Sequence, residues 1–268
     1  MSAIAAAFAR CRKEKRAAFV PFLVAGDPDL ETTGRLVSGL AAAGADVIEL
    51  GVPFSDPIAD GPVNQEAANR ALASGTTLAG ILATVAALRP GVDVPIVLFT
   101  YFNPIHAYGI ARFADHAARS GVDGVLAVDL PPEEAEGEYL ERCEADGIDP
   151  IFLLAPTSTK ERVRAVAAHG RGFVYYVSRT GVTGNEGALP PGLAREVKTL
   201  RRKLTLPLAV GFGISTPEQV RDVATIADGV VVGSALVRTI AGSAGAPDLV
   251  ERVTRQAGDL ARACRRKR

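Results

Sequence analysis

The chain has 268 residues, 48% of them apolar, and its 30 Lys and Arg balance 30 Asp and Glu to a formal net charge of +0. This composition is typical of a packed globular protein and excludes an intrinsically disordered chain. The balanced charge also gives no electrostatic reason to expect a nucleic-acid partner. The length allows one or two average domains, but a single α/β barrel also fits, and we expect one domain over residues 1–268.

Cysteine usage and the chain ends indicate the compartment. Cys11, Cys143 and Cys264 are widely spaced and form no CxxC pair, which argues against a disulfide framework and against a zinc site. The N-terminus places apolar residues before its basic cluster, the reverse of the order in a secretory signal peptide. The uncharged stretch 71–88 is interpreted as a loop and a buried helix. We therefore expect a cytoplasmic protein without a membrane partner, and we assign no function to the basic tail 262–268.

The elements alternate along the chain. An N-terminal helix is predicted within residues 1–16, because Ile4, Phe8 and Cys11 form an apolar stripe that we expect to pack against the rest of the fold. Runs rich in β-branched and aromatic residues then predict eight strands, at 18–24, 46–50, 94–100, 123–128, 149–153, 171–177, 206–212 and 228–233. Helix-start signals stand at 29–31, 132–134, 158–161 and 215–218.

This alternation predicts the fold class. Most of the predicted strands lack an apolar/polar alternation, as expected of parallel strands that are covered on both faces. Eight βα units in this length predict a closed (β/α)₈ TIM barrel with an extra N-terminal helix, and a doubly wound open sheet is the alternative. The units that begin at residues 46 and 171 are unusually long. We expect their surplus in βα loops or short extra helices, where barrels build their active sites.

Carboxylates cluster after the second predicted strand. Glu49 lies near the carboxyl end of an otherwise apolar strand, where burial disfavours its charged form, so we expect a raised pKa and a chemical task. The alternative is a structural Glu held by an ion pair. Asp60 follows a turn-forming Ser-Asp-Pro stretch, although Asp56 fits the role of a turn residue better. Glu49 and Asp60 together indicate acid–base chemistry.

Glycine-rich segments follow the last three predicted strands: GVTG at 181–184, GFGIS at 211–215 and GSA at 233–235. Each segment alone is equally well explained by an ordinary turn. Barrels, however, commonly bind phosphate with the loops after their last two strands and a helix N-terminus, where backbone N–H groups can approach an anion. The combination predicts a phosphate ester as ligand.

Other catalytic groups are poorly placed. The lysines fall in predicted helices or near chain ends, so none is expected to form a Schiff base inside the barrel. His116 and His169 are predicted on helix surfaces and His106 in a loop near the barrel mouth, which argues against a metal site. No Ser-His-Asp or Cys-His arrangement can be placed on adjacent strand ends. The chemistry is therefore expected to depend on carboxylates.

Residues 48–62, IELGVPFSDPIADGP, resemble the long signature of the tryptophan synthase alpha subunits. Further similar segments are PFLVAGDP at 21–28, YFNP at 101–104, DLP at 129–131, SRTGVTG at 178–184 and GFGI at 211–214, and the resemblance extends from about Ile4 to Ala241. It implies retro-aldol cleavage of indole-3-glycerol phosphate to indole and glyceraldehyde 3-phosphate in tryptophan biosynthesis. It also implies an α2β2 heterotetramer, in which indole passes to a β subunit that holds pyridoxal phosphate. This chain itself would need no cofactor.

The resemblance also implies residue roles. Glu49 would protonate indole C3 and accept the proton of the glycerol 3′-hydroxyl, and Asp60 would stabilise charge at the indole N–H. Phe22, Tyr101, Tyr175 and Phe212 would line the indole pocket, Thr183 would close over it and orient Asp60, and Gly184, Gly213, Gly233 and Ser234 would bind phosphate. The β subunit would contact Asp56, Asn103, Pro131 and Pro132.

One residue departs from the family pattern. Asn64 stands where the family usually has an apolar residue near the indole. Because a buried amide needs partners, either the pocket is more polar than usual or Asn64 turns toward Gln65 and solvent.

Three other functions stay open. The first is a stand-alone indole-releasing lyase, which would use the same residues. The second is a catalytically silent, allosteric barrel subunit, which the presence of Glu49, Asp60 and Thr183 disfavours. The third is another phosphate-binding barrel, such as an isomerase of histidine or tryptophan biosynthesis, which would leave the signature at 48–62 unexplained.

Overall fold

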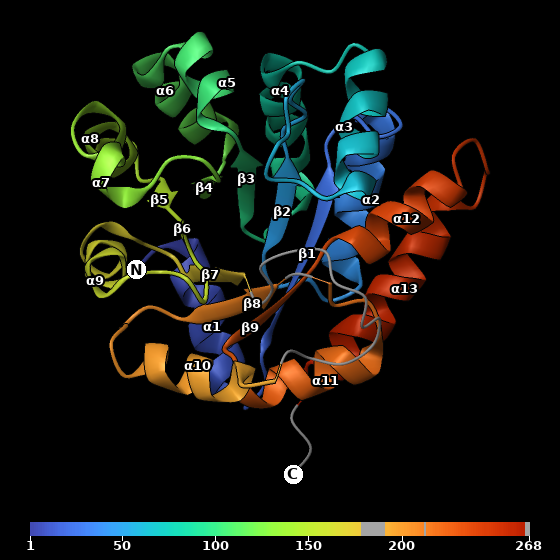
Figure 1. The fold of residues 1–268 in the computed structure, drawn as a ribbon. Coiled ribbons are helices and arrows are strands. Elements are labelled where there is room, and N and C mark those ends of the chain that lie inside the picture. The colour runs from blue at the N-terminus through green and yellow to red at the C-terminus, as the bar shows by residue number, and fades with distance from the viewer. Residues whose placement is uncertain (178–190, 212, 266–268) are drawn as a thin grey trace.

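The computed structural model describes residues 1–177, 191–211 and 213–265. Within these residues, nine parallel strands form one sheet in the order β5-β4-β3-β2-β1-β9-β8-β7-β6, with helices around it (Figure 1). The strands are β1 Ala18–Val24, β2 Ile48–Gly51, β3 Ile96–Thr100, β4 Gly124–Ala127, β5 Asp149–Pro150, β6 Phe152–Leu154, β7 Val174–Val177, β8 Leu208–Gly211 and β9 Gly229–Val232.

The sheet closes through the segment predicted as the fifth strand, which Ile151 divides into β5 and β6. β5 pairs with β4 and β6 pairs with β7, and the N–H group of Ile151 donates to the carbonyl oxygen of Val125 in β4 at 2.8 Å. One extended segment thus joins the two ends of the strand order. The TIM barrel is therefore confirmed, and the doubly wound open sheet is wrong.

Helices follow most strands, and an additional one precedes the barrel. They are α1 Ala3–Lys13, α2 Leu30–Ala42, α3 Pro62–Ala73, α4 Leu78–Leu88, the 3₁₀ turn η1 Arg89–Gly91, α5 Phe102–Tyr108, α6 Ile110–Ser120, α7 Pro132–Ala135, α8 Glu138–Ala145, α9 Lys160–His169, α10 Leu193–Arg201, α11 Pro217–Ile226, α12 Ser234–Gly242 and α13 Leu249–Ala263. The additional residues of the long unit after β2 form the extra helix α3, as expected. The surplus after β7 falls largely outside the described residues.

Helix caps confirm the predicted starts. Asp29 and Thr159 accept hydrogen bonds from backbone N–H groups in the first turns of α2 and α9, and Thr216 forms a capping box with Gln219 at α11. The signal at 132–134 opens only the single turn α7, and a new helix begins after Gly137, whose φ is +91°. The prediction for His106 is wrong, because this residue lies in α5 rather than in a loop.

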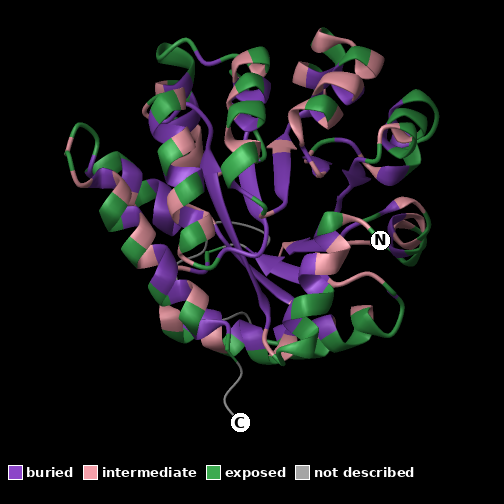
Figure 2. Ribbon diagram, turned by 180° about the vertical axis from the view of Figure 1, so that it is seen from behind, coloured by how far each residue is buried: buried purple, intermediate pink, exposed green. Residues whose placement is uncertain are grey.

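The core lies inside the barrel and between the barrel and its helices. Figure 2 shows the strands almost entirely buried, while the helices alternate between buried and exposed sides. Ile4, Phe8 and Cys11 of α1 join the cluster inside the barrel, so this helix packs against the barrel as predicted. All three cysteines are free and buried, and burial raises the pKa of each thiol to about 12.

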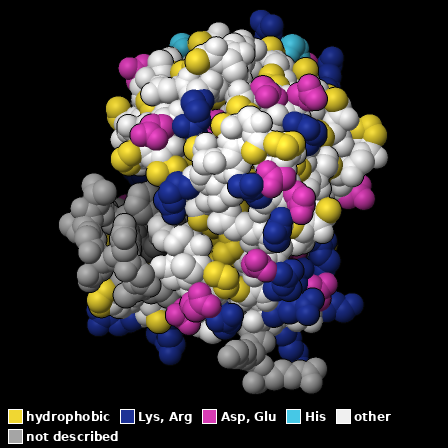
Figure 3. Space-filling view, turned by 90° about the vertical axis from the view of Figure 1, so that its right-hand side faces the viewer, with side chains coloured by type: hydrophobic (Ala, Val, Ile, Leu, Met, Phe, Trp, Pro, Cys, Tyr) yellow, Lys and Arg dark blue, Asp and Glu magenta, His cyan; other side chains and the backbone are white. Residues whose placement is uncertain are grey.

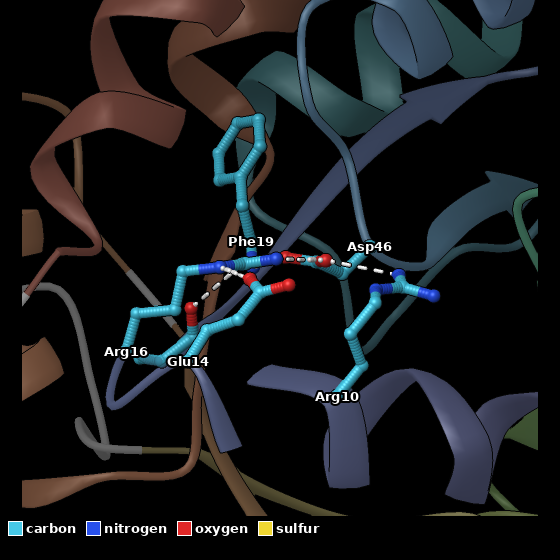
Figure 4. A network of polar contacts seen from close by, with 6 residues as sticks. Arg10, Glu14, Arg16, Phe19 and Asp46 are labelled. Carbon is cyan, nitrogen blue, oxygen red and sulfur yellow. Dashed lines mark hydrogen bonds and ion pairs between the residues drawn. The ribbon is translucent and has the colours of Figure 1, made fainter. Parts of the chain in front are cut away.

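Aspartates just before β2, β4 and β9 stabilise the amino-terminal end of the barrel. Asp46, Asp123 and Asp228 each accept a backbone N–H from the beginning of a neighbouring strand, and Arg16, Arg89 and Arg201 pair with them at 2.5, 2.5 and 2.9 Å. Figure 4 shows Asp46 between Arg16 and Arg10. Burial opposes ionisation of Asp46, but hydrogen bonds from Arg16 and Phe19 outweigh it and lower its pKa. This end of the barrel thus serves stability.

The surface has mixed charge where it is visible from the side of α12 and α13. Figure 3 shows acidic and basic side chains interspersed on that face. On α13, Arg252 pairs with Asp248 and Arg255 with Glu251, one helical turn apart. In the part of the chain that the structure describes, no single helix is long and apolar enough to cross a membrane. The pair Pro62–Ala73 and Leu78–Gly91 would reach that length and composition together, with a 91° bend between them.

Candidate active site

Glu49 lies inside the barrel, near its carboxyl end. It is the second residue of β2, in register with Phe22 of β1 and Val97 of β3, so its side chain shares the interior face with theirs. It is 0% exposed, and neither carboxylate oxygen has a hydrogen-bond partner among the described residues. Within the described residues, the structure therefore does not support the structural alternative, a buried Glu held by an ion pair.

This environment determines the protonation of Glu49. Burial raises its pKa from 4.5 to about 8, because the apolar interior disfavours the charged form and no cation among the described residues compensates. The raised pKa predicted from the sequence is confirmed. At neutral pH Glu49 mostly holds its proton, which suits a general acid that becomes a base after it gives the proton away.

Asp60 is held by groups from two elements. Tyr101, at the carboxyl end of β3, donates its hydroxyl to Asp60 Oδ2 at 2.9 Å and accepts the N–H of Ala59 at 2.9 Å. Gln65 of α3 donates its side-chain amide to the backbone carbonyls of Asp60 at 2.8 Å and Pro57 at 3.3 Å. Burial raises the pKa of Asp60, and interactions with Tyr101 and Asn64 partly offset this. The loop thus presents a preorganised carboxylate.

Asn64 faces the pocket rather than solvent. It lies in the first turn of α3 and lines a cavity that also contains Phe22, Asp60 and Phe99. Its Oδ1 atom is buried and has no hydrogen-bond partner in the described part of the chain. An unpaired buried acceptor costs roughly 1–3 kcal/mol. Of the two orientations open from the sequence, the more polar pocket is confirmed.

Aromatic rings occupy space that inward-facing glycines leave free. A Cβ on Gly51 would lie 2.8 Å from the ring of Phe22, and one on Gly233 would lie 3.0 Å from it. A Cβ on Gly211 would lie 2.2 Å from the hydroxyl of Tyr175. Burial raises the pKa of Tyr175, and the nearby charges of Glu49 and Asp60 raise it further. The structure therefore brings Phe22 and Tyr175 together with both carboxylates.

Sequence reasoning missed Phe99, which joins these rings. Its centroid lies 5.2 Å from that of Phe22 and 6.4 Å from that of Tyr175, both in edge-on arrangements. Phe99 follows the inward-facing Val97 by two residues in β3, so strand alternation was the available signal. The sequence also gave no role to Gln65 beyond a possible contact with Asn64.

The predicted phosphate residues lie at the ends of β8 and β9. Gly233 is the N-cap of α12 and Ser234 its first residue, and no side chain caps this helix. Gly213 is exposed, has a φ of +76°, and has no atom within 4 Å of the position of a Cβ. A helix N-terminus beside an open glycine turn provides N–H groups and a favourable dipole for an anion. Thr183, Gly184 and Phe212 lie outside the described residues.

The predicted partner-contact residues differ in exposure. Asp56 and Asn103 are exposed, Pro131 is half-buried and Pro132 is buried within the chain. The loop between β2 and α3 also presents Ile58, which is 88% exposed and which the sequence analysis did not single out.

A further cavity lies away from these residues. Its volume is about 370 Å³, and Ser2, Asp149, Gly172 and Pro207 line it at the amino-terminal end of the barrel, away from Glu49 and Asp60. Among the residues that the structure describes, no three His, Cys, Asp or Glu side chains gather in a way that could hold a metal ion. The functional site is thus defined by its chemistry and not by cavity size.

Comparisons with known proteins agree with the resemblance. Residues 8–265 match the family described as tryptophan synthase alpha chain. The tryptophan synthase alpha chain of Geotalea daltonii is 56% identical over 86% of this chain and 87% of its own length, and that of Pelobacter propionicus is 51% identical over 98% of each.

Solved structures show the same relationship. The crystal structure of tryptophan synthase subunit alpha from Legionella pneumophila superimposes with a TM-score of 0.91 and 36% identity, covering 98% of both chains. A chain of Mycobacterium tuberculosis tryptophan synthase gives a TM-score of 0.89 at 36% identity and covers 99% of both. On the family match, these identities and this shared barrel, the chain belongs to the tryptophan synthase alpha chain family, whose members are lyases that cleave indole-3-glycerol phosphate.

Proposed function

We propose that Glu49 and Asp60 perform the cleavage of indole-3-glycerol phosphate into indole and glyceraldehyde 3-phosphate in this chain. The observation that supports this most strongly is Glu49 itself, a fully buried carboxyl group without any hydrogen-bond partner and with a pKa of about 8. Such a group is costly for folding, and its cost is explained by a reaction that needs a proton donor inside an apolar pocket.

The proton pathway is as follows. Glu49 gives its proton to C3 of the indole ring, which makes the ring a cation and weakens the bond from C3 to the glycerol carbon. That bond breaks, its electron pair returns to the ring, and the adjacent hydroxyl becomes the aldehyde and loses its proton to the Glu49 carboxylate. Glu49 thus ends protonated, as it began, but it now carries the proton of the hydroxyl group, while its original proton stays on C3 of the released indole. The protonated ring is the electron sink, so this pathway requires no cofactor on this chain.

Asp60 stabilises the cationic ring. A carboxylate beside the ring N–H lowers the energy of the positive charge that appears after protonation of C3. Phe22, Phe99 and Tyr175 enclose the ring, and Tyr101 keeps Asp60 in place. The phosphate binds at the N-terminus of α12 and at Gly213, and the residues outside the described part, Thr183, Gly184 and Phe212, complete the site as the resemblance implies.

The glycine assignment predicts a specific loss of affinity. Replacing Gly213 with Val is expected to weaken binding of glycerol 3-phosphate, because the side chain would project where the anion approaches. The expected loss is roughly tenfold or more, which corresponds to about one charge-assisted hydrogen bond. Replacing Gly233 with Ala should weaken binding as well, by pressing on Phe22. Isothermal titration calorimetry measures both affinities.

Gly245→Val is the matched control. Gly245 also has a positive φ, +78°, and open space at the Cβ position, but it lies between α12 and α13. It should bear the same backbone strain with unchanged phosphate affinity. Unchanged affinity in both site variants would remove the phosphate assignment.

We also propose a β subunit as partner, in an α2β2 assembly with pyridoxal phosphate on the partner and indole as the shared intermediate. Its support in this chain is the loop between β2 and α3, which holds the active-site Asp60 and presents Ile58 and Asp56 to solvent. A partner bound to this loop would directly influence the position of Asp60.

The assay that tests the function measures indole release by the purified chain with and without a β subunit. We expect slow turnover alone and at least ~10-fold more with the partner, within the usual range of coupling between sites. Ile58→Gln should lower this activation, whereas Leu72→Gln, at an exposed apolar position of α3, should not. Full activity without a partner would favour the stand-alone lyase, and no indole in either assay would favour the catalytically silent barrel.

A further inference from the structure

Asn64 places an unused hydrogen-bond acceptor in the active site. Among the described residues, the buried side-chain oxygens without a partner are the two of Glu49 and Oδ1 of Asn64. All three belong to the same end of the barrel. Because buried acceptors are normally paired, their concentration here points to a ligand that brings its own donors.

The orientation of the Asn64 amide follows from its neighbour. Asp60 in its charged form is only an acceptor, so the N–H side of the amide must face it. This interaction partly offsets the rise that burial causes in the pKa of Asp60. The oxygen side then remains unpaired, beside the same carboxylate. A donor that approaches Asp60 from the pocket therefore also meets Oδ1 of Asn64.

The lining of the pocket favours a donor that is carried by an aromatic ring. Asn64 lines the cavity together with Phe22, Phe99 and Ala68, which offer apolar and aromatic surface. The indole ring has a single donor, its N–H group. We propose that Asn64 recognises the ring N–H jointly with Asp60, accepting from it with Oδ1 while its amide N–H group orients the carboxylate. This inference rests on the proposed function, since it takes the ring N–H to be bound at Asp60.

The test compares two ligands that differ only at the ring nitrogen, which carries a hydrogen in one and a methyl group in the other. One is indole-3-propyl phosphate, which resembles the substrate without its hydroxyl groups, and the other is its 1-methylindole counterpart. Their affinities are measured by calorimetry for the unmodified chain and for the variants, and the change in their ratio between chains reports the contribution of each residue to recognition at the ring nitrogen. We expect a preference of at least ~10-fold for the ligand with the N–H group, about the effect of one hydrogen bond to a charged acceptor.

Asn64→Leu removes both amide functions and nearly preserves the shape of the side chain. We expect it to lower the preference at least ~3-fold, with Asn64→Ala as a second variant in case the first perturbs folding. Asn69→Leu, at an exposed position of the same helix, is the matched control and should leave the ratio unchanged. A ratio that stays within twofold in both Asn64 variants overturns the proposal.

The Asp60→Asn background separates direct recognition from an effect through Asp60. If Oδ1 accepts from the ring, Asn64→Leu lowers the preference in this background too. A change that occurs only when Asp60 is intact contradicts the proposal, because Asn64 would then act solely through the carboxylate. If Asp60→Asn leaves both the preference and turnover intact while Asn64→Leu lowers the preference, the inference about Asn64 holds and the proposed role of Asp60 fails.

Discussion

Glu49→Gln is expected to lower kcat for indole release by at least ~100-fold and up to ~10⁴-fold, the usual contribution of a general acid–base group. Glutamine fits the same space, yet it has no titratable proton to give to the ring carbon or to recover from the hydroxyl. Because the variant keeps the pocket, KM should change little, and the loss should be concentrated in kcat. Steady-state assays with saturating substrate measure it.

Two controls keep this result specific. Glu66→Gln changes an exposed carboxyl group on α3, close in sequence to the site, and should retain turnover. The stability of Glu49→Gln should equal or exceed that of the unmodified chain at pH 8, because glutamine cannot carry the buried charge that Glu49 acquires near its pKa of about 8. Turnover comparable to that of the unmodified chain would exclude Glu49 from the mechanism.

The pH dependence of activity shows whether Glu49 acts in its protonated form. Because its pKa in the folded chain is about 8, the proton needed for the ring is present below pH 8 and is lost as the pH rises further. The ratio kcat/KM reports the protonation state of the free enzyme, so it should fall as the pH rises above about 8. Folding shows the same linkage: the stability contribution of Glu49 is complete below pH 4.5 and is lost as the pH rises through about 8. Both dependences should be absent from Glu49→Gln.

The barrel was predictable because its signals are local and repeated. Each strand was recognisable as a short apolar run and most helices by their caps, but the strand boundaries were placed too early at Asp46, Asp123 and Asp228. These residues precede their strands and use their side chains to accept N–H groups of neighbouring strands. Such pairing is a tertiary interaction between distant residues, so composition and periodicity do not reveal it. The break at Ile151 likewise depends on how the barrel closes.

The site was predictable from the sequence where an ionisable side chain stands in a segment that should be buried. A carboxylate in an apolar strand marked Glu49, and the structure shows it buried without a partner. The positions of Phe99 and Gln65 depend instead on which side of an element faces the pocket and on a loop that folds back onto α3. The sequence showed that Asn64 departs from the family pattern, but only the three-dimensional arrangement shows that its side chain faces the pocket.

Asp60→Asn is expected to lower kcat/KM by at least ~100-fold, which corresponds to about 2.7 kcal/mol of transition-state stabilisation. An amide cannot supply the negative charge that stabilises the protonated ring, although Tyr101 can still donate to its oxygen and hold the loop. The fold should be retained, since Asp60 is half-buried and the substitution preserves its shape. Asp93→Asn, which changes an exposed aspartate before β3, should retain activity.

The pH profile distinguishes loss of charge from loss of shape. Because burial raises the pKa of Asp60, the charged form should be lost as the pH falls through a value above the ordinary 3.8, which produces an acid limb in kcat/KM. The Asn variant should lack this limb and show a low, level rate on the acid side. If Asp60→Asn retained both the limb and the turnover, the charge at this position would play no part in the reaction, and Tyr101 and Gln65 would serve only to shape the loop between β2 and α3.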